Sequence, residues 1–199
     1  MPSSTFLNLP AQKKARVEQA LLDEFSRAPL SQAQVSNIVA QAQIARGAFY
    51  RYFDDLNDAY RYLLCQALRD LHHDLPSSAP RSEAQESETP SSEEGSTARE
   101  DKAGKNQQAD NLEKLKLSAY QQAQAFVKQA QLSRYYQLMY WYYHENNASF
   151  TPSSFQPEES PTTWAIATLS HAAIRECLLD RENAHLYLAR FREALEHVK

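Results

Sequence analysis

Two arginines and two tyrosines lie close together in the short segment 46–52. Arg46 and Arg51 are the best candidates for charge-assisted hydrogen bonds, either to phosphates or bidentately to guanine in a major groove. Tyr50 and Tyr52 each bring a hydroxyl that can bond a phosphate oxygen from an apolar ring anchored in a domain. These residue types at this spacing indicate contact with nucleic acid. The alternative interpretation is that the aromatic rings only pack a small core.

The charge of the chain is unevenly distributed along the sequence. The 199 residues carry a formal net charge of −4, which alone argues against a general nucleic-acid binder because phosphates are neutralised by clustered Lys and Arg. Residues 1–53 hold six basic and three acidic side chains, whereas residues 76–108 hold four basic and seven acidic ones. The asymmetry is modest, and a normal solvated surface is an equally good interpretation of it.

Three segments near the N-terminus have the apolar spacing of helices. The first helix begins after Pro10, and the second follows a capping-box pattern of Ser31 with Gln34 and ends near Ala40. The third covers about residues 45–52. Two short helices separated by a few residues indicate a helix-turn-helix.

The rest of the chain divides at a polar segment. Residues 76–108 contain no aromatic residue and only Ala as an apolar side chain, so we predict a disordered acidic insertion there. Before it, Asp54 and Asp55 can cap a longer helix that ends near Leu75. The predicted organisation is a helix-turn-helix domain over 1–56, a connecting helix over 57–75, the insertion, and a helical ligand-binding and dimerisation domain over 109–199.

The predicted C-terminal domain ends in two helices with apolar faces, at about 160–179 and 181–198. Ser160 and Pro161 form the N-cap and first-turn pair of the earlier helix. We expect the two helices to pair with their symmetry mates in the four-helix interface of a homodimer. Small residues would allow close approach there, namely Ala165, Ala172 and Ala173.

A strongly aromatic segment lies within the same domain. Tyr136, Tyr140 and Tyr143 share one face of a helix, and such residues can line a pocket for an apolar or aromatic small molecule. Core packing is an equally good explanation for this tyrosine face.

Residues 38–60, IVAQAQIARGAFYRYFDDLNDAY, resemble the helix-turn-helix signature of the tetracycline repressor (TetR) family, whose form is close to IAxxAGVSxGTxYxYFxxKxxL. The residues that match at the family's spacing are Ile38, Ala42, Ile44, Gly47, Tyr50, Tyr52 and Phe53. The resemblance covers about residues 9–65 at the level of the motif. Beyond them it concerns only the all-α architecture.

The resemblance implies a ligand-responsive transcription regulator, by default a repressor, that binds a pseudo-palindromic double-stranded DNA operator as a homodimer. The small-molecule effector is not identified by the sequence. The DNA-contacting positions that the resemblance implies are Gln34, Ala45, Arg46, Gly47, Ala48, Tyr50, Arg51 and Tyr52.

Three positions depart from the family signature. Gln43 occupies the position where the family has a turn glycine. Ala45 occupies the position of the Ser or Thr that caps the recognition helix, and Leu56 that of a lysine that contacts phosphate. Gln43 implies a less favourable backbone conformation or a different turn. These departures motivate a second hypothesis, a helical protein-interaction adaptor that has kept the fold and lost DNA binding.

Other function classes have no support in the sequence. It contains no GxSxG, HExxH, P-loop or GxGxxG motif, so we expect neither an enzyme nor a bound cofactor. Cys65 and Cys177 form no CxxC pair and the histidines are scattered, so no metal site is indicated. No run of about 18 apolar residues occurs, so we expect no membrane span, and a cytoplasmic location.

Overall fold

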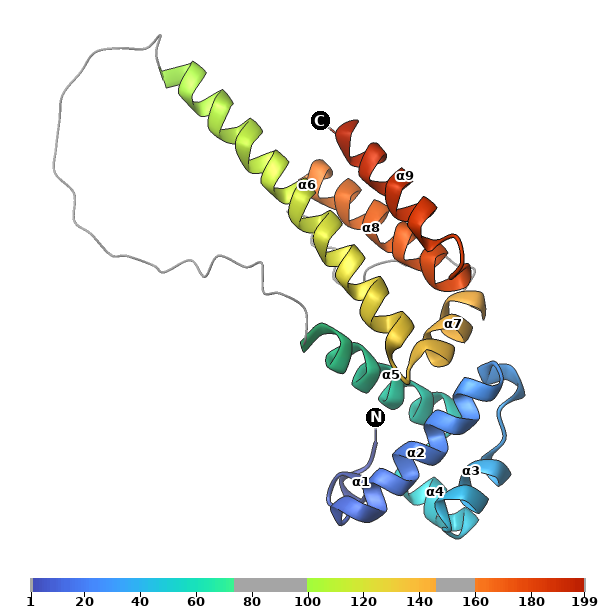
Figure 1. The fold of residues 1–199 in the computed structure, drawn as a ribbon. Helices are drawn as coiled ribbons and strands as arrows, with labels where there is room; N and C mark the ends of the chain where they lie inside the picture. The colour runs from blue at the N-terminus through green and yellow to red at the C-terminus, as the bar shows by residue number, and fades with distance from the viewer. Residues whose placement is uncertain (1, 74–99, 146–159, 199) are drawn as a thin grey trace, which may run out of the picture.

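The computed structural model describes residues 2–73, 100–145 and 160–198, and all regular structure in these ranges is helical. The prediction of an all-α fold with an N-terminal helix-turn-helix is thus confirmed. Helices α1 to α4 form a compact group at one end of the molecule (Figure 1). At the other end α6, α8 and α9 run side by side, and α5 and α7 lie between the two groups (Figure 1).

The N-terminal group begins with α1 (Ser4–Leu7), a short helix that apolar periodicity did not predict. The Ser3 hydroxyl accepts a hydrogen bond from the Phe6 amide at 3.3 Å, and the Phe6 ring is fully buried. Four residues are too few to show a helical period, so only the side-chain cap marks this element in the sequence. Helix α2 (Ala11–Arg27) follows Pro10, as predicted.

The helix-turn-helix consists of α3 (Val35–Ala42) and α4 (Arg46–Tyr52), and a 3-10 turn, η1 (Leu30–Gln32), precedes it. The predicted capping box of Ser31 with Gln34 is wrong. Gln34 is itself the N-cap residue of α3, its side chain makes no capping hydrogen bond, and Ser31 lies in η1. The Gln34 amide instead donates to the Glu24 carboxylate of α2 at 2.8 Å.

Aromatic rings fill the centre of the N-terminal group. The Phe6 ring lies 4.7 Å from the ring of Phe53, which lies 5.7 Å from that of Phe49, and all three are almost fully buried. Leu21 of α2 and Ile38 of α3 close the same core. Each such side chain contributes about 1.5–3 kcal/mol by burial, so α4 is held on a packed base.

Helix α5 (Leu56–His73) leads out of the helix-turn-helix. The Asp55 carboxylate accepts a hydrogen bond from the Asp58 amide at 2.7 Å, which confirms Asp55 as a cap of this helix. The predicted end of the helix near Leu75 lies outside the described residues.

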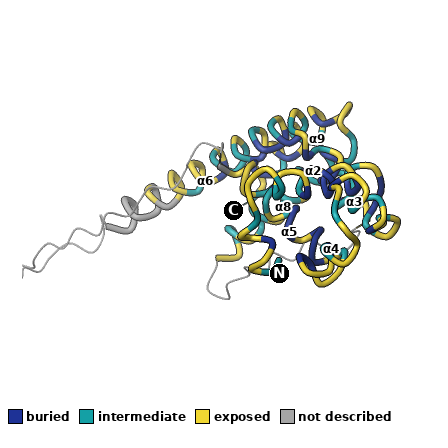
Figure 2. Tube along the Cα trace, turned by 90° about the horizontal axis from the view of Figure 1, so that it is seen from below, coloured by how far each residue is buried: buried dark blue, intermediate teal, exposed yellow. Residues whose placement is uncertain are grey.

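Helix α6 (Glu100–Leu132) begins within the segment that the sequence analysis assigned to a disordered insertion. That prediction is wrong for residues 100–108, and residues 76–99 lie outside the described ranges. The sequence EDKAGKNQQ is rich in Glu, Lys, Ala and Gln, which favour a helix without any apolar face to bury. Figure 2 shows the described part of α6 extending beyond the other helices, with mostly exposed residues where it does so.

The C-terminal helices are α7 (Tyr136–Glu145), α8 (Pro161–Leu179) and α9 (Ala184–Glu196). Ser160 caps α8 by accepting a hydrogen bond from the Thr163 amide at 3.1 Å, with Pro161 in the first turn, as predicted. Phe191 and Leu195 of α9 pack with Ala173 of α8 inside the chain. Since Ala173 is buried there, it cannot provide the predicted close approach between protomers. None of the described helices has the length and apolar character needed to cross a membrane.

Candidate nucleic-acid interface

The turn between α3 and α4 has the left-handed backbone that a glycine would normally supply. Gln43 has φ 54° and ψ 48°, and it is the non-glycine residue with positive φ among those described. The Gln43 amide donates to the Ala40 carbonyl at 3.3 Å and the Ile44 amide to the Val39 carbonyl at 3.1 Å. Arg16 of α2 donates to the Gln43 side-chain oxygen at 3.3 Å. The turn therefore adopts the left-handed conformation with Gln43 in place of a glycine, at the cost of backbone strain.

Helix α4 presents its polar residues to solvent. Arg46 and Arg51 are exposed, as is Tyr50, whose side chain is 49% accessible. The Arg46 guanidinium lies 6.0 Å from the centre of the Tyr50 ring, and that ring meets the buried Phe49 edge-on at 5.3 Å. Tyr50 is thus anchored on one side and free to meet a partner on the other.

The small residues of this surface leave the backbone of α4 accessible. Ala45 and Gly47 are exposed and Ala48 is partly buried. A Cβ atom added to Gly47 would meet no atom within 4 Å, so nothing within the described chain requires a glycine there. Ala45 is the N-cap residue of α4 and its side chain makes no capping hydrogen bond, as expected where Ala replaces the Ser or Thr of the family signature.

Tyr52 does not lie on the exposed surface. Its side chain is only 4% accessible, and its ring packs 5.8 Å from that of Phe6. Tyr52 follows Phe49 by three residues and precedes the buried Phe53, so it shares the core-facing side of α4. The expectation that Tyr52 faces DNA is corrected by this burial. The spacing of Tyr52 three residues after Phe49 was the sequence signal that could have predicted its burial.

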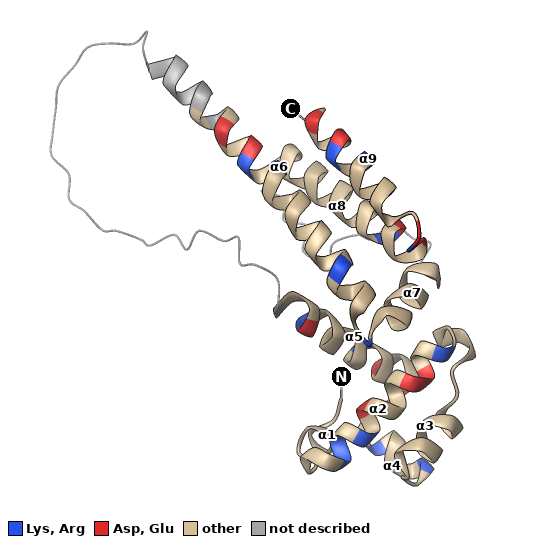
Figure 3. Cartoon of the chain, viewed as in Figure 1, with Lys and Arg blue, Asp and Glu red and all other residues tan. Residues whose placement is uncertain are grey.

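Basic side chains gather at the end of the molecule that holds α4. Lys13, Lys14 and Arg16 lie near the start of α2, whereas the carboxylates of α2 lie farther along that helix (Figure 3). Arg46 and Arg51 add two charges on α4 (Figure 3). An end of this kind attracts a polyanion although the chain as a whole is acidic.

Glu24 of α2 ties the helix-turn-helix together and was not singled out by the sequence analysis. Its side chain is 2% accessible, accepts from the Gln34 amide at 2.8 Å and the Asn37 amide group at 3.1 Å, and pairs with Arg27 at 2.9 Å. Burial alone would raise the pKa of Glu24, but these hydrogen bonds and the Arg27 charge together hold that pKa below its ordinary value. Gln34 is exposed and close to this cluster, and its side-chain oxygen accepts from the Ser36 hydroxyl at 3.3 Å.

Helix α7 contacts the helix-turn-helix group through polar side chains. The Glu145 carboxylate accepts from the Leu30 amide at 3.1 Å and from the Ser31 hydroxyl at 2.6 Å. The Trp141 indole donates to the Ser26 carbonyl at 3.1 Å. We call these three hydrogen bonds the α7 clamp. It connects the C-terminal helices to the turn that enters α3.

The three tyrosines predicted to line a ligand pocket make separate contacts within the described chain. Tyr136 donates to the Leu178 carbonyl at 3.1 Å, and Tyr140 stacks on His144 at 5.7 Å. Tyr143 is buried in the core that continues from the N-terminal group, and burial raises its pKa to about 12. The tyrosine face thus packs between helices, and its role as a ligand site stays a prediction. A groove does exist elsewhere, between α6 and α9.

The described residues contain no group of three or more His, Cys, Asp or Glu side chains arranged to hold a metal ion. Cys65 is exposed and Cys177 is buried, and both are free thiols.

Comparison with known proteins gives structural neighbours only. No protein-family model and no curated protein matches the sequence. A TetR family transcriptional regulator from Chloroflexus aurantiacus J-10-FL is 20% identical, with 100% of this chain and 94% of that chain covered at a TM-score of 0.43. A TetR transcriptional regulator from Rhodococcus sp. RHA1 is 14% identical, with 94% and 96% covered at a TM-score of 0.41.

Proposed function

We propose that this chain is a sequence-specific, DNA-binding transcription regulator of the TetR type, in which α4 is the recognition helix. The observation that carries the proposal is the exposed polar face of α4, which holds Arg46, Tyr50 and Arg51 on a core of buried aromatic rings. A helix presented in this way after a tight turn can enter a major groove.

Each residue of the face has a separate role in the proposal. Arg46 and Arg51 bond to guanine edges or phosphates, and the Tyr50 hydroxyl bonds to a phosphate. The small side chains of Ala45 and Gly47 let the backbone of α4 approach the DNA closely. Ala48 and Gln34 lie at its margins, where Gln34 contacts a phosphate.

The proposed active form is a homodimer. The outward face of α8 carries Trp164, Thr168 and Ala172, and that of α9 carries Leu186 and Ala189, all of them exposed. Pairing these faces about a twofold axis would place two α4 helices in successive major grooves, which repeat at about 34 Å. We further propose that the regulator acts in the cytoplasm and represses transcription.

The proposed response to a small-molecule effector is a change in the spacing of the two α4 helices. The α7 clamp is the element that would transmit it, since Trp141 bonds to the last turn of α2 and Glu145 bonds to η1, which leads into α3. An effector acts only if it binds one spacing more tightly than the other.

A helical adaptor without DNA binding remains the second candidate. It is favoured by two observations: Ala45 makes no cap for α4, and Leu56 packs against the core where the family signature has a lysine. Such an adaptor would have no salt-dependent affinity for DNA.

The test is binding of the purified chain to its own upstream DNA at two salt concentrations. We expect sequence-specific binding that weakens steeply with salt, and that weakens further in Arg46→Ala by about 1–3 kcal/mol. Tyr50→Phe removes one hydroxyl and should lose about 1 kcal/mol. Arg181→Ala, at an exposed arginine between α8 and α9 and outside the proposed interface, is the control. Equally weak DNA binding by the wild type and all three variants would favour the adaptor.

A further inference from the structure

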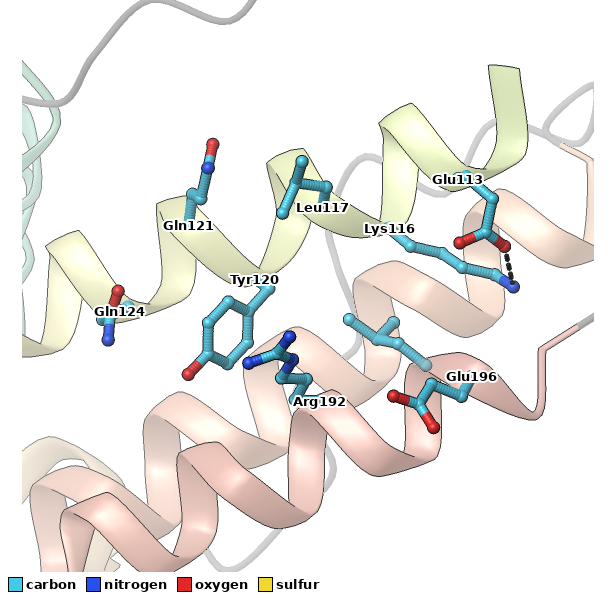
Figure 4. Close-up of a pocket in the computed structure, with 9 residues that line it drawn as sticks. Glu113, Lys116, Leu117, Tyr120, Gln121, Gln124, Arg192 and Glu196 are labelled. Atoms are coloured by element: carbon cyan, nitrogen blue, oxygen red, sulfur yellow. Dashed lines mark hydrogen bonds and ion pairs between the residues drawn. The ribbon is translucent and has the colours of Figure 1, made fainter. Parts of the chain in front are cut away.

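The groove between α6 and α9 has no part in the proposed DNA contacts. It has a volume of about 350 Å³ and is lined by residues of both helices, among them Leu117 and Tyr120 of α6 and Arg192 and Leu195 of α9 (Figure 4). Sites for small molecules commonly have volumes of about 300–1,000 Å³, so the groove suits a ligand at the small end of that range.

Part of the groove is apolar. Leu195 is buried in the core between α6, α8 and α9, and Tyr120 packs at the edge of the same core. Leu117 is exposed to solvent although it lines the groove. A ligand with a hydrocarbon body would cover this leucine and gain the free energy of removing apolar surface from water.

Two cations lie in the groove, and they differ in their partners. Lys116 is only 8% accessible, and its ammonium group is paired with the Glu113 carboxylate at 2.9 Å (Figure 4). The Arg192 guanidinium lies 5.8 Å from the centre of the Tyr120 ring. Within the described chain Arg192 makes no ion pair, so its hydrogen-bond donors are available to an anion.

The nearby carboxylate limits the charge of such an anion. Glu196 lines the groove one helical turn after Arg192. Its negative charge opposes a second negative charge on a ligand, since like charges at close range repel. The groove therefore favours a ligand with a single negative charge.

We propose that the groove between α6 and α9 binds a small organic monocarboxylate with an apolar body. The carboxylate accepts hydrogen bonds from Arg192, and the body lies against Leu117, Tyr120 and Leu195. This assignment deepens the proposed function by giving the effector site, and it rests on that function for its regulatory meaning. The groove lies apart from the tyrosine face of α7, where the sequence predicted a ligand site.

The experiment is calorimetric titration of the full chain, without DNA, with 4-phenylbutyrate and with octanoate. We expect saturable binding of one molecule of each carboxylate per chain. The neutral 4-phenylbutyramide, which matches the first ligand in shape, should bind at least about tenfold more weakly because it cannot form the charge-assisted bonds. Absence of saturable binding of both carboxylates at millimolar concentration would overturn the proposal.

Two variants of α9 locate the site. Arg192→Gln should weaken binding of 4-phenylbutyrate at least about tenfold. Arg190→Gln, two residues earlier and on the opposite side of the helix, should bind like the wild type. Both arginines are exposed, so the melting temperatures of the two variants should match that of the wild type. Equal affinity of the two variants would overturn the assignment.

The outcome is separable from that of the proposed function. A chain that binds the carboxylates but no DNA would refute the regulator and leave the groove assignment standing. A chain that binds DNA specifically but neither carboxylate would refute the groove assignment alone.

Discussion

At the scale of single residues, one buried carboxylate of α2 holds the start of α3, the first helix of the helix-turn-helix. Glu24 satisfies the amide at the start of α3, the Asn37 side chain and the Arg27 guanidinium at once. Its removal would leave buried donors without an acceptor, which costs more than the loss of one average hydrogen bond.

Glu24→Gln should therefore lower the free energy of unfolding by about 2 kcal/mol at neutral pH. The folded-state pKa of Glu24 lies below its ordinary value of 4.5, so its charge stabilises the fold above that value. This contribution is lost as the pH falls from the ordinary value through the folded-state value. Chemical denaturation at pH 7 and pH 3 measures the effect, and the difference between the two proteins should shrink at the lower pH.

Asp23→Asn is the matched control, because Asp23 is exposed on the same helix and bonds only to the Gln19 side chain. It should change stability by less than about 0.5 kcal/mol. A loss in Glu24→Gln as small as that of the control would show that the buried carboxylate does not hold α2 to α3.

The exposure of the residues proposed to contact DNA was largely predictable. The spacing of the motif predicted Arg46, Tyr50 and Arg51, and all three are exposed. Tyr52 was predicted on that surface and is buried, because Phe6 of an unpredicted helix covers it. Glu24 could not be predicted, since its partners come from a helix whose position relative to α2 depends on the whole fold.

At the scale of elements, α7 joins the two groups of helices. Its Glu145 carboxylate bonds an amide and a hydroxyl of η1, which lies more than one hundred residues earlier in the sequence (separations of 115 and 114). This contact could not be predicted from the sequence, because a glutamate at the end of a helix is usually exposed to solvent and its partner is not indicated by any local pattern. The same limit applies to Tyr136, Tyr140 and Tyr143: packing was one of two interpretations of their helical face, and the sequence did not identify the helices against which they pack.

Glu145→Ala should release the turn that enters α3. We expect faster amide hydrogen exchange in residues 28–34 and unchanged exchange in α8 and α9, since the clamp orders only the turn. The loss in global stability should be about 1 kcal/mol because both hydrogen bonds are near solvent. Exchange followed by mass spectrometry measures the effect.

Glu193→Ala removes an exposed carboxylate of α9 and serves as the comparison. Identical exchange of residues 28–34 in both variants and in the wild type would refute a coupling role for the α7 clamp.

Helix α6 shows why one boundary was misplaced. Its first residues carry no apolar side chain larger than Ala, so they lack the apolar period by which the other helices were found. Their intrinsic preference for helix, together with the helix that continues after them, was the remaining signal.

At the scale of the whole molecule, the proposed function requires two copies of the chain. The apolar stripe of α9 that was expected to serve the dimer lies inside the chain, where Phe191 and Leu195 pack with α8. The outward faces of α8 and α9 are what remains for a partner. A stable interface buries about 1,600 Å² in total, which two helices of this length can supply.

Leu186→Glu tests this interface. Leu186 is 56% accessible in the single chain, so the change should hardly affect the stability of a protomer. In a dimer it would bury a charge, and we expect the dissociation constant to rise at least about tenfold. Sedimentation equilibrium measures it, with Leu132→Glu on α6 as the control of similar exposure. Unchanged association of Leu186→Glu would exclude this face.

The central claim is that α4 of a dimer reads DNA, and selection of binding sites from random duplex DNA by the full chain tests it most directly. The account predicts enrichment of an inverted repeat whose half-sites lie about one helical turn, or a multiple of it, apart. Arg46→Ala should relax the preference at one position of each half-site while keeping the repeat. Recovery of no sequence preference by the wild-type protein would contradict the account.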